Sequence, residues 1–366
     1  MFRAPAFFCA AIAFSAPASA ELVKFEEAGG AVRATLKIEG KGYSLDAKLL
    51  RTKDAAPGSA LFIDAAQHEA LAPTALAHGM SVFALDLANL PAAARAQALR
   101  DLLPPLREKM SAKRVLGRGA GEIGAAFVEA GALFDGLLLQ DFTTGAAKAP
   151  RSIEVWGSDA YWRASSPPPL TGQEPENRLR FFIAGATTGA SANCAGPLNT
   201  RSQAPALRAL LVVLDEWTKG VKPPASRAPA AADLGDVRSL VWPKIPGLPT
   251  PPAGERRAPK IDADGNETAG LRLPDHALPV ATFTGFGAQK DKNGPACAAG
   301  VAIPFPSAKS DREKTGDSRS SLVERYGSRA YFVATMRVVA DRLIKERLLL
   351  KEDADAYVAA ARQAPF

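Results

Sequence analysis

The sequence has 366 residues, of which 47% are hydrophobic, and a formal net charge of +7 at pH 7. A chain of this length and composition can bury a sizeable core, which excludes a disordered protein. Its 45 basic and 38 acidic residues are interleaved and form no basic stripe. We therefore expect a solvated surface and no nucleic acid partner.

The N-terminus has the layout of a secretory signal peptide. Arg3 precedes an apolar run over residues 4–14, and the small residues Ala18 and Ala20 end the segment. This pattern predicts a signal peptide over 1–20 with cleavage after Ala20. The apolar run is shorter than the roughly 20 residues that span a bilayer. We expect a periplasmic or secreted protein with no stable membrane insertion after cleavage.

Cleavage at that point would remove Cys9 and leave two cysteines, Cys194 and Cys297. An even pair in an oxidising compartment favours one disulfide between them. Two separate thiols are the alternative, because the distance and orientation that a disulfide requires cannot be derived from a sequence.

Short apolar segments then recur along the chain. Alternating residues predict two strands over 31–40 and 43–51 around a tight turn at Gly40-Lys41-Gly42. Later apolar runs are separated by helical stretches, and they lie at 60–66, 80–87, 113–117, 134–142, 152–157 and 178–185. This order predicts an α/β core with an open, mainly parallel sheet and helices on both faces.

The core is expected to cover residues 21–221, because a helix with an apolar stripe from Leu207 to Trp217 ends before Gly220. Residues 222–260 are rich in proline and predict an extended connector. Residues 261–366 form a C-terminal region with a β-like run at 277–284. Its main helix carries apolar residues at helical spacing, namely Phe332, Met336, Val339 and Leu343.

The stretch VLGRGAGEIG supports two interpretations. In the first, Gly119, Gly121 and Gly124 form a Gly-x-Gly-x-x-Gly loop that binds a dinucleotide, with Asp141 as the carboxylate for a ribose. The loop, however, follows several strands. A protein secreted unfolded also reaches a compartment without a soluble nicotinamide pool. A single glycine fingerprint is weak evidence for a dinucleotide-binding oxidoreductase.

In the second interpretation the same residues form a nucleophile elbow, Gly117-x-Gly119-x-Gly121, whose serine is replaced by Gly119. The catalytic partners of an elbow follow in chain order, an acid after a later strand and a histidine after the last one. Those positions fall near Asp159 and near Thr187-Thr188.

The segments RLRFFIAGATTG and KIDADGNETAGLRLPDHALPVATFTG, with others between Tyr161 and Tyr357, resemble a bacterial family of exported α/β-hydrolase-domain proteins. The resemblance implies an α/β-hydrolase core with a serine at the elbow and a histidine after the last strand. When the family's motif is aligned with this sequence, the resemblance implies that Gly119 stands at the serine position and Thr188 at the histidine position. Relatives have a glutamate where Ala160 stands, and here Asp159 precedes it by one residue.

These losses are chemically serious. Glycine has neither a hydroxyl nor a thiol to attack a carbonyl, and threonine does not act as a base near neutral pH. The leading hypothesis is a degenerate hydrolase that binds a small ligand or partner in the inherited crevice. One alternative is an ester hydrolase with a rearranged site, for which His68 is the candidate base. The other is the dinucleotide enzyme.

No cofactor or metal site is expected. Asp262-Ala-Asp264-Gly-Asn266-Glu267 resembles the start of a calcium loop, but the twelfth position, where that loop needs a glutamate, is Leu273. We interpret this segment as a turn.

Overall fold

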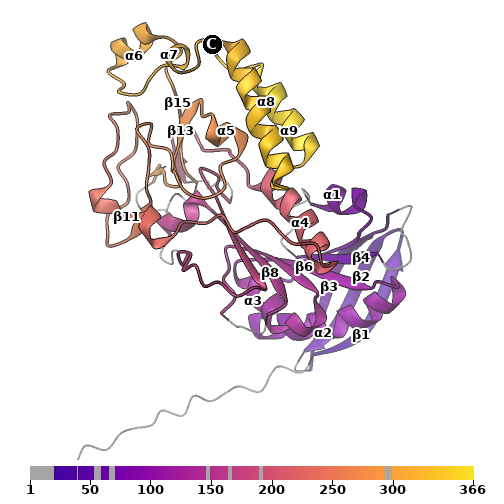
Figure 1. Cartoon of the computed structure of the whole chain (residues 1–366). Coiled ribbons are helices and arrows are strands. Elements are labelled where there is room, and N and C mark those ends of the chain that lie inside the picture. The colour runs from indigo at the N-terminus through magenta and orange to yellow at the C-terminus, as the bar shows by residue number, and fades with distance from the viewer. Residues whose placement is uncertain are drawn as a thin grey trace, which may run out of the picture.

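The computed structural model describes residues 20–38, 40–52, 59–65, 71–145, 149–163, 167–188, 193–291, 293, 297 and 299–366. Within this part of the chain, one large sheet has the strand order β1-β2-β3-β5-β4-β6-β7-β8-β9 (Figure 1). Its strands are β1 Ala20–Ala28, β2 Ala31–Ile38, β3 Lys41–Leu50, β4 Ala60–Asp64, β5 Ser81–Leu85, β6 Arg114–Ala120, β7 Gly136–Gln140, β8 Arg151–Gly157 and β9 Arg178–Ile183.

The sheet combines an antiparallel edge with a parallel centre. β1, β2, β3 and β5 pair antiparallel, whereas β5, β4, β6, β7, β8 and β9 pair parallel. β4 and β7 are buried along their whole length, as expected for strands covered on both faces. The prediction of a mainly parallel α/β sheet is confirmed.

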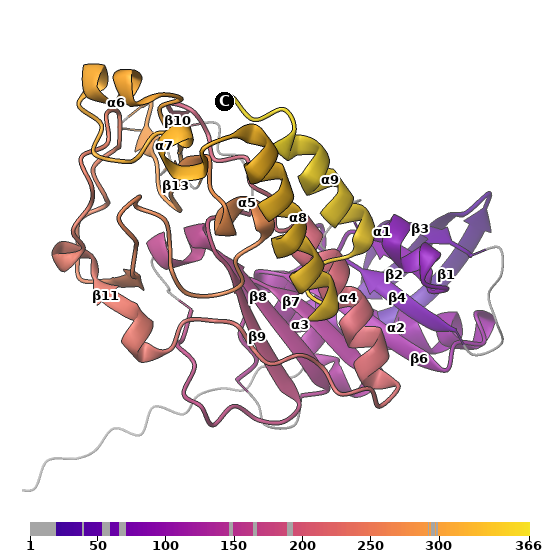
Figure 2. The same ribbon diagram turned by 45° about the horizontal axis from the view of Figure 1, so that its top comes forward.

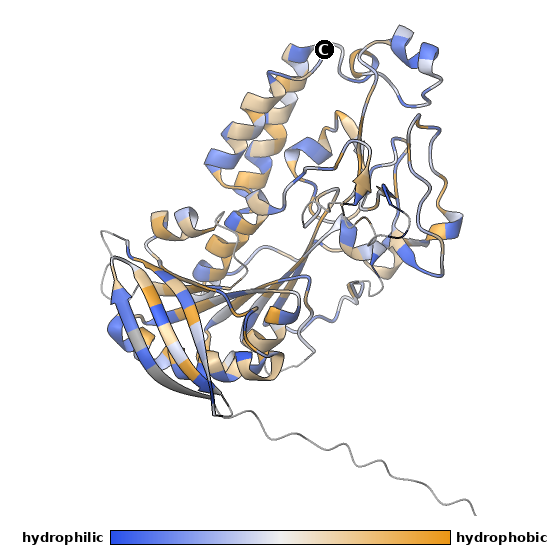
Figure 3. Cartoon of the chain, turned by 180° about the vertical axis from the view of Figure 1, so that it is seen from behind, coloured by the Kyte–Doolittle hydropathy of each residue, from blue (hydrophilic) through white to orange (hydrophobic). Residues whose placement is uncertain are grey.

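At the antiparallel edge of the sheet, the alternation of apolar and polar residues predicts two of the strands. β2 and β3 are the predicted pair, and alternate residues of β3, such as Leu45, Ala47 and Leu49, are buried. Figure 3 shows hydrophilic and hydrophobic residues alternating along this part of the sheet. The sequence did not predict β1, which begins at Ala20. Apart from Ala20, the predicted signal peptide lies outside the described residues.

Helices cover both faces of the sheet. α2 (Ala92–Lys109) and α3 (Glu122–Glu129) pack on one face, and α1 (Ala72–Ala77) and α4 (Ala204–Thr218) pack on the other (Figures 1 and 2). Each face thereby has its own hydrophobic core. No helix of the described residues is both long and apolar enough to cross a membrane.

The C-terminal region packs on the α4 side, where Ala340 and Leu343 of α8 join the same core as α4. Its helices are α5 Pro274–Ala277, α6 Lys309–Thr315, α7 Leu322–Tyr326, α8 Arg329–Lys345 and α9 Lys351–Ala361. Short strand pairs stand outside the large sheet: β10 Cys194–Ala195 with β14 Ala288–Gln289, β11 Leu234–Asp236 with β12 Arg257–Pro259, and β13 Ala281–Phe283 with β15 Ala302–Pro304. Short 3₁₀ helices are η1 Gly131–Leu133, η2 Ser158–Trp162, η3 Ala231–Asp233 and η4 Val237–Ser239.

Two later segments protect the open edge of β9. The backbone of Arg227, in the proline-rich connector, bonds to Arg180 and Phe182 at 2.8 Å. Leu271 donates its backbone N–H to the Phe182 carbonyl and accepts from Ala184. An unpaired strand edge invites pairing with other chains, so the connector and the C-terminal region close the sheet here.

Candidate active site

The sharpest turn of the core lies between β6 and α3. β6 ends at Ala120 and α3 begins at Glu122, so Gly121 alone forms the turn. Gly121 has φ 51° and ψ −131°, a backbone conformation that side chains rarely adopt. A Cβ added there would meet no atom within 4 Å. A strained strand-to-helix turn with open space around it is the geometry of a nucleophile elbow.

Gly119 occupies a different kind of position. It lies inside β6, opposite Leu139 of β7. A Cβ at Gly119 would lie 3.0 Å from the Cα of Gly124 and from the ring of Phe127, so this glycine allows α3 to pack closely on β6. The elbow position is therefore Gly121 and not Gly119 as the sequence suggested. Both positions are glycine, which has no side chain.

The structure brings the other two predicted positions together. Asp159 lies in η2, directly after β8, and Thr188 lies in the loop after β9. The backbone N–H of Thr188 donates to Oδ1 of Asp159 at 3.2 Å, and its hydroxyl donates to Oδ2 at 2.5 Å. Asp159 thus holds Thr188 in the way that the acid of a triad holds its histidine.

An arginine completes this cluster. Nη2 of Arg163 contacts Oδ2 of Asp159, Oγ1 of Thr188 at 2.9 Å and Oδ2 of Asp141 at 3.3 Å. Asp141 directly follows β7 and has φ 51°, which is uncommon outside glycine. Burial raises the pKa of Asp141 to about 6, against the lowering effect of the Arg163 charge. The sequence did not point to Arg163.

The same geometry argues against a dinucleotide loop. The N–H of Gly121 donates to the carbonyl of Gln140 at 2.9 Å, and the N–H of Gly124 donates to the carbonyl of Gly121 at 3.0 Å. A Cβ at Gly124 would lie 2.8 Å from Phe142. A phosphate needs free backbone N–H groups and an open approach. Here the N–H groups of Gly121 and Gly124 already form backbone hydrogen bonds, and Phe142 packs against Gly124.

The histidines do not supply a base among the described residues. His68, the proposed substitute, lies outside them, as do all of residues 66–70. His78 is exposed at the end of α1. His276 is fully buried in α5.

A buried serine, glutamate and histidine lie close together where the C-terminal region meets the turns after β8 and β9. Oε2 of Glu267 accepts hydrogen bonds from the hydroxyl of Ser158 and from the N–H of Gly185, the latter at 2.8 Å. Nε2 of His276 lies 2.9 Å from the backbone carbonyl oxygen of Glu267. This contact does not involve the Glu267 carboxylate. All three side chains are buried. The cluster therefore ties the C-terminal region to the turns after β8 and β9 and offers no path for a substrate.

Glu267 should make stability depend on pH. Burial raises its pKa from 4.5 to about 7, so between these values the folded state binds a proton that the unfolded state lacks. Unfolding free energy then falls as pH rises through this window, by on the order of 3 kcal/mol, and is flat above it. Urea titrations from acid to neutral pH should show a smaller loss in Glu267→Gln than in the native protein, because the raised pKa of Asp141 contributes to the loss in both. The exposed Glu255→Gln should behave like the native protein, and equal slopes for all three would refute the assignment.

A cavity of about 90 Å³ opens beside Thr188. Arg118 of β6 lies in its wall and is fully buried, and Nη1 of Arg118 donates to Asp64 at 3.2 Å. Nε of Arg118 donates to Oε1 of Gln140 at 3.1 Å. The polar residues that line the cavity are Arg118, Gln140, Thr187, Thr188, Ser202 and Gln203. The only sequence signal for this site was a charged residue inside the apolar run VLGRGAG.

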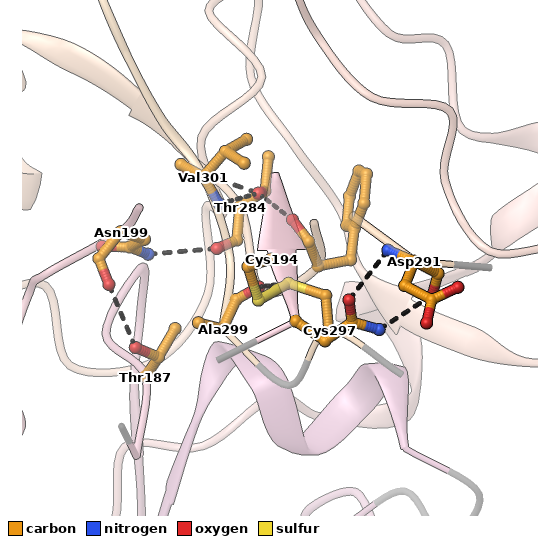
Figure 4. The surroundings of a disulfide bond; sticks show 10 residues. Thr187, Cys194, Asn199, Thr284, Asp291, Cys297, Ala299 and Val301 are labelled. Carbon is orange, nitrogen blue, oxygen red and sulfur yellow. Dashed lines mark hydrogen bonds between the residues drawn. A yellow bond between two sulfur atoms is a disulfide. The ribbon is translucent and has the colours of Figure 1, made fainter. Parts of the chain in front are cut away.

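Cys194 and Cys297, the two cysteines singled out in the sequence, are joined by a disulfide in the structure (Figure 4). It links β10, which follows the loop after β9, to the segment before β15. Nearby, the side-chain amide of Asn199 donates to the carbonyls of Gly185 and Thr284 at 2.8 and 3.0 Å. The loop that carries Thr188 is therefore anchored to the C-terminal region by covalent and hydrogen bonds.

The aspartate-rich segment forms a tight turn. Oδ1 of Asp262 accepts from the N–H groups of Asp264 and Asn266 at 2.9 and 3.0 Å. The side chain of Asp264 pairs with Arg325. Within the described residues, no three His, Cys, Asp or Glu side chains are grouped so as to hold a metal ion.

Comparison with known proteins assigns a family. A model of an alpha/beta hydrolase domain matches residues 164–359, more than half of the 366-residue chain. The chain belongs to this family of alpha/beta hydrolase domains. The match includes Thr188 and Glu267 of the hydrolase domain, whereas Gly121 and Asp159 precede it. No curated protein sequence matches.

Solved structures similar to the hydrolase domain include several esterases. Est1E from Butyrivibrio proteoclasticus is 10% identical with a TM-score of 0.36, and the match covers 51% of this chain and 98% of that one. A serine hydrolase without a lid from Xanthomonas campestris is 12% identical with a TM-score of 0.30, covering 36% and 73%. A glucuronoyl esterase from Caldicellulosiruptor kristjansonii is 14% identical with a TM-score of 0.29. The match covers 35% of this chain and less than half, 45%, of that esterase.

Proposed function

We propose that this hydrolase-domain protein is catalytically inactive and binds a small molecule in the crevice at the carboxyl ends of its parallel strands. The observation that carries the proposal is Gly121 at the turn between β6 and α3. A covalent acyl intermediate needs a nucleophile at this turn, activated by an adjacent base. Glycine offers no nucleophile, and Thr188, hydrogen-bonded to Asp159, offers no base.

Binding is what the remaining features support. Ligands of open α/β sheets bind outside the carboxyl ends of the strands, where the polar cluster around Asp159 and the cavity beside Thr188 lie. The polar residues that line the cavity are Arg118, Gln140, Thr187, Thr188, Ser202 and Gln203, and ligand sites place a few polar groups in a concave pocket. Their presence at this edge supports a ligand-binding role rather than a purely structural one.

The proposal includes export to the periplasm or the medium. Its support is the signal-peptide pattern of the first 20 residues. The disulfide between Cys194 and Cys297 fits an oxidising compartment, because such bonds are rare in reducing ones.

A serine-directed fluorophosphonate probe tests inactivity. We expect the purified mature protein to remain unlabelled and to hydrolyse short aryl esters no faster than the same protein after denaturation, with an active serine esterase as the positive control. Stoichiometric labelling or brisk turnover would refute the proposal. His68→Ala would then decide the mechanism, since unchanged turnover would exclude His68 as a substitute base.

A further inference from the structure

A second and larger cavity lies on the α1 side of the antiparallel edge of the sheet. It is a groove of about 1120 Å³, which is not smaller than the roughly 300–1,000 Å³ of ligand pockets. Ala72 and Pro73 at the start of α1 border it, as do Asp64 at the end of β4 and Asp86 directly after β5. The groove shares no described lining residue with the cavity beside Thr188, so it is a separate site.

Small side chains form the floor of the groove. Ala28 of β1 pairs with Ala31 of β2. Ala31 in turn pairs with Lys48 of β3, which pairs with Ala84 of β5. Paired residues of neighbouring strands have their side chains on the same face of a sheet, so these four lining residues form one row across four strands. Three steps of about 4.8 Å between strands give a row of about 14 Å, which is long enough for an extended hydrocarbon chain.

The groove is open because the core on the α1 side ends before it reaches β1 and β2. Leu50 of β3 and Ala84 of β5 pack at the margin of that core, which contains no described residue of β1 or β2. The opposite core, under α2, includes Val32 and Ala34 of β2. An uncovered sheet face usually carries polar side chains. The alanine row is therefore apolar surface that a ligand can cover.

Carboxylates outnumber cations around the groove. The described lining residues include five acids, Glu26, Glu27, Asp46, Asp64 and Asp86, and two bases, Arg33 and Lys48. Four of the acids already have a cation: Glu26 pairs with Lys24, Glu27 with Arg51, Asp46 with Arg33 and Asp64 with Arg118. The charge of the groove thus favours a cation over an anion.

Asp86 is the lining carboxylate without a cationic partner among the described residues. Its oxygens accept from the backbone N–H of Ala88 at 2.8 Å and from the side-chain amide of Asn89 at 3.2 Å. These hydrogen bonds hold the carboxylate in place at the β5 end of the alanine row, so a ligand cation would meet an oriented counter-charge. Lys48, which also has no ion pair, is exposed to solvent, where an ammonium group is well hydrated.

We propose that this groove binds a small amphipathic cation, a molecule with a hydrocarbon body and an ammonium group. The hydrocarbon body lies along the alanine row and against Leu50, and the ammonium group pairs with Asp86. The site goes beyond the proposed function, because it uses no residue of the elbow, of the Asp159 cluster or of the cavity beside Thr188.

The test compares probes of one length and different charge. Octylammonium, octanoate and the shorter butylammonium are titrated into the mature protein at millimolar concentrations, and calorimetry and saturation-transfer NMR follow binding. We expect octylammonium to bind more tightly than either of the other two. The net charge of +7 would favour octanoate in non-specific binding, so a preference for the ammonium reports the groove. Binding of octanoate or butylammonium as tight as that of octylammonium, or no binding of octylammonium, would overturn the inference.

A variant of the floor locates the hydrocarbon body. Ala31 is exposed, and phenylalanine is favoured in strands, so Ala31→Phe should fold and fill the groove. The affinity for octylammonium should fall at least about tenfold, which is about 1.4 kcal/mol. Ala360→Phe, at an exposed residue of α9, is the matched control and should bind like the native protein. Unchanged affinity in Ala31→Phe would place the ligand elsewhere and refute the site.

A second variant locates the ammonium group. Asp86→Asn removes the charge and keeps an oxygen that can accept from the N–H of Ala88. The affinity for octylammonium should fall about two- to fivefold, as for partly exposed ion pairs. Asp341→Asn, at an exposed residue of α8, is the charge-matched control. Equal affinity of Asp86→Asn and the native protein would refute the pairing with Asp86. Fluorophosphonate labelling tests inactivity separately, so the two proposals can fail independently.

Discussion

Changing Gly121 to serine and Thr188 to histidine together is expected to create a protein that reacts with a fluorophosphonate probe and hydrolyses short aryl esters. The serine would stand at the strained turn, in open space, and the histidine would take the place of a residue that Asp159 already holds by two hydrogen bonds. A positioned general base contributes about 10²–10⁴-fold. We expect the double variant to exceed the native rate by at least about 10²-fold.

Single variants are the first control. Members of a triad act as a unit, so one alone contributes little. Gly121→Ser lacks a base and Thr188→His lacks a nucleophile, and each should stay close to the native rate. A gain from Gly121→Ser alone would mean that another group, such as His68, serves as the base.

Gly119→Ser combined with Thr188→His is the matched control for position. A side chain at residue 119 would press on Gly124 and Phe127, and overpacking of this kind costs about 1–3 kcal/mol. This variant should be less stable and unreactive. Reactivity from residue 119 and none from residue 121 would overturn the assignment of the elbow.

Removing the disulfide is expected to have the largest effect on stability. Cys194 and Cys297 are 103 residues apart in sequence, and closing a loop of about 100 residues restricts the unfolded chain by up to about 4.7 kcal/mol in the chain-entropy model. Cys194→Ala with Cys297→Ala should lower the free energy of unfolding by about 2–5 kcal/mol. Urea unfolding of both proteins under oxidising conditions measures the difference.

Reduction provides the control for that change. The native protein in excess dithiothreitol should unfold at the same urea concentration as the double variant, whereas the double variant should not respond to the reductant. Because the disulfide anchors the loop after β9, hydrogen exchange at Thr187 and Thr188 should also be faster in the reduced native protein and in the double variant. Equal stability of the native protein and the double variant would show that the loop is held by its hydrogen bonds alone.

The three glycines at the end of β6 differ in what packing requires of them. Gly117 and Gly119 remain because Phe127 and the backbone of α3 leave no room for a Cβ. Gly121 is under no such steric restriction. A nucleophile can thus be absent from the elbow without loss of the fold, because its side chain points into open space and contributes no packing.

The sequence by itself determined most strands of the large sheet, though not β1, and the approximate edge on which the site lies. Apolar runs such as those of β4 and β7 report burial on both faces, which is a local property. The position of Asp159 and Thr188 after successive strands was predictable for the same reason, since carboxyl ends of parallel strands share one edge.

Only the tertiary structure decided which glycine forms the elbow and what surrounds it. Gly119 and Gly121 are the same residue type, and they differ in a backbone angle and in what a Cβ would meet. The pairing of Arg118 with Asp64 and of Glu267 with Ser158 joins residues that are 54 and 109 positions apart. Contacts of that range depend on how the chain is packed and not on local periodicity, so the sequence pattern carried no signal for them.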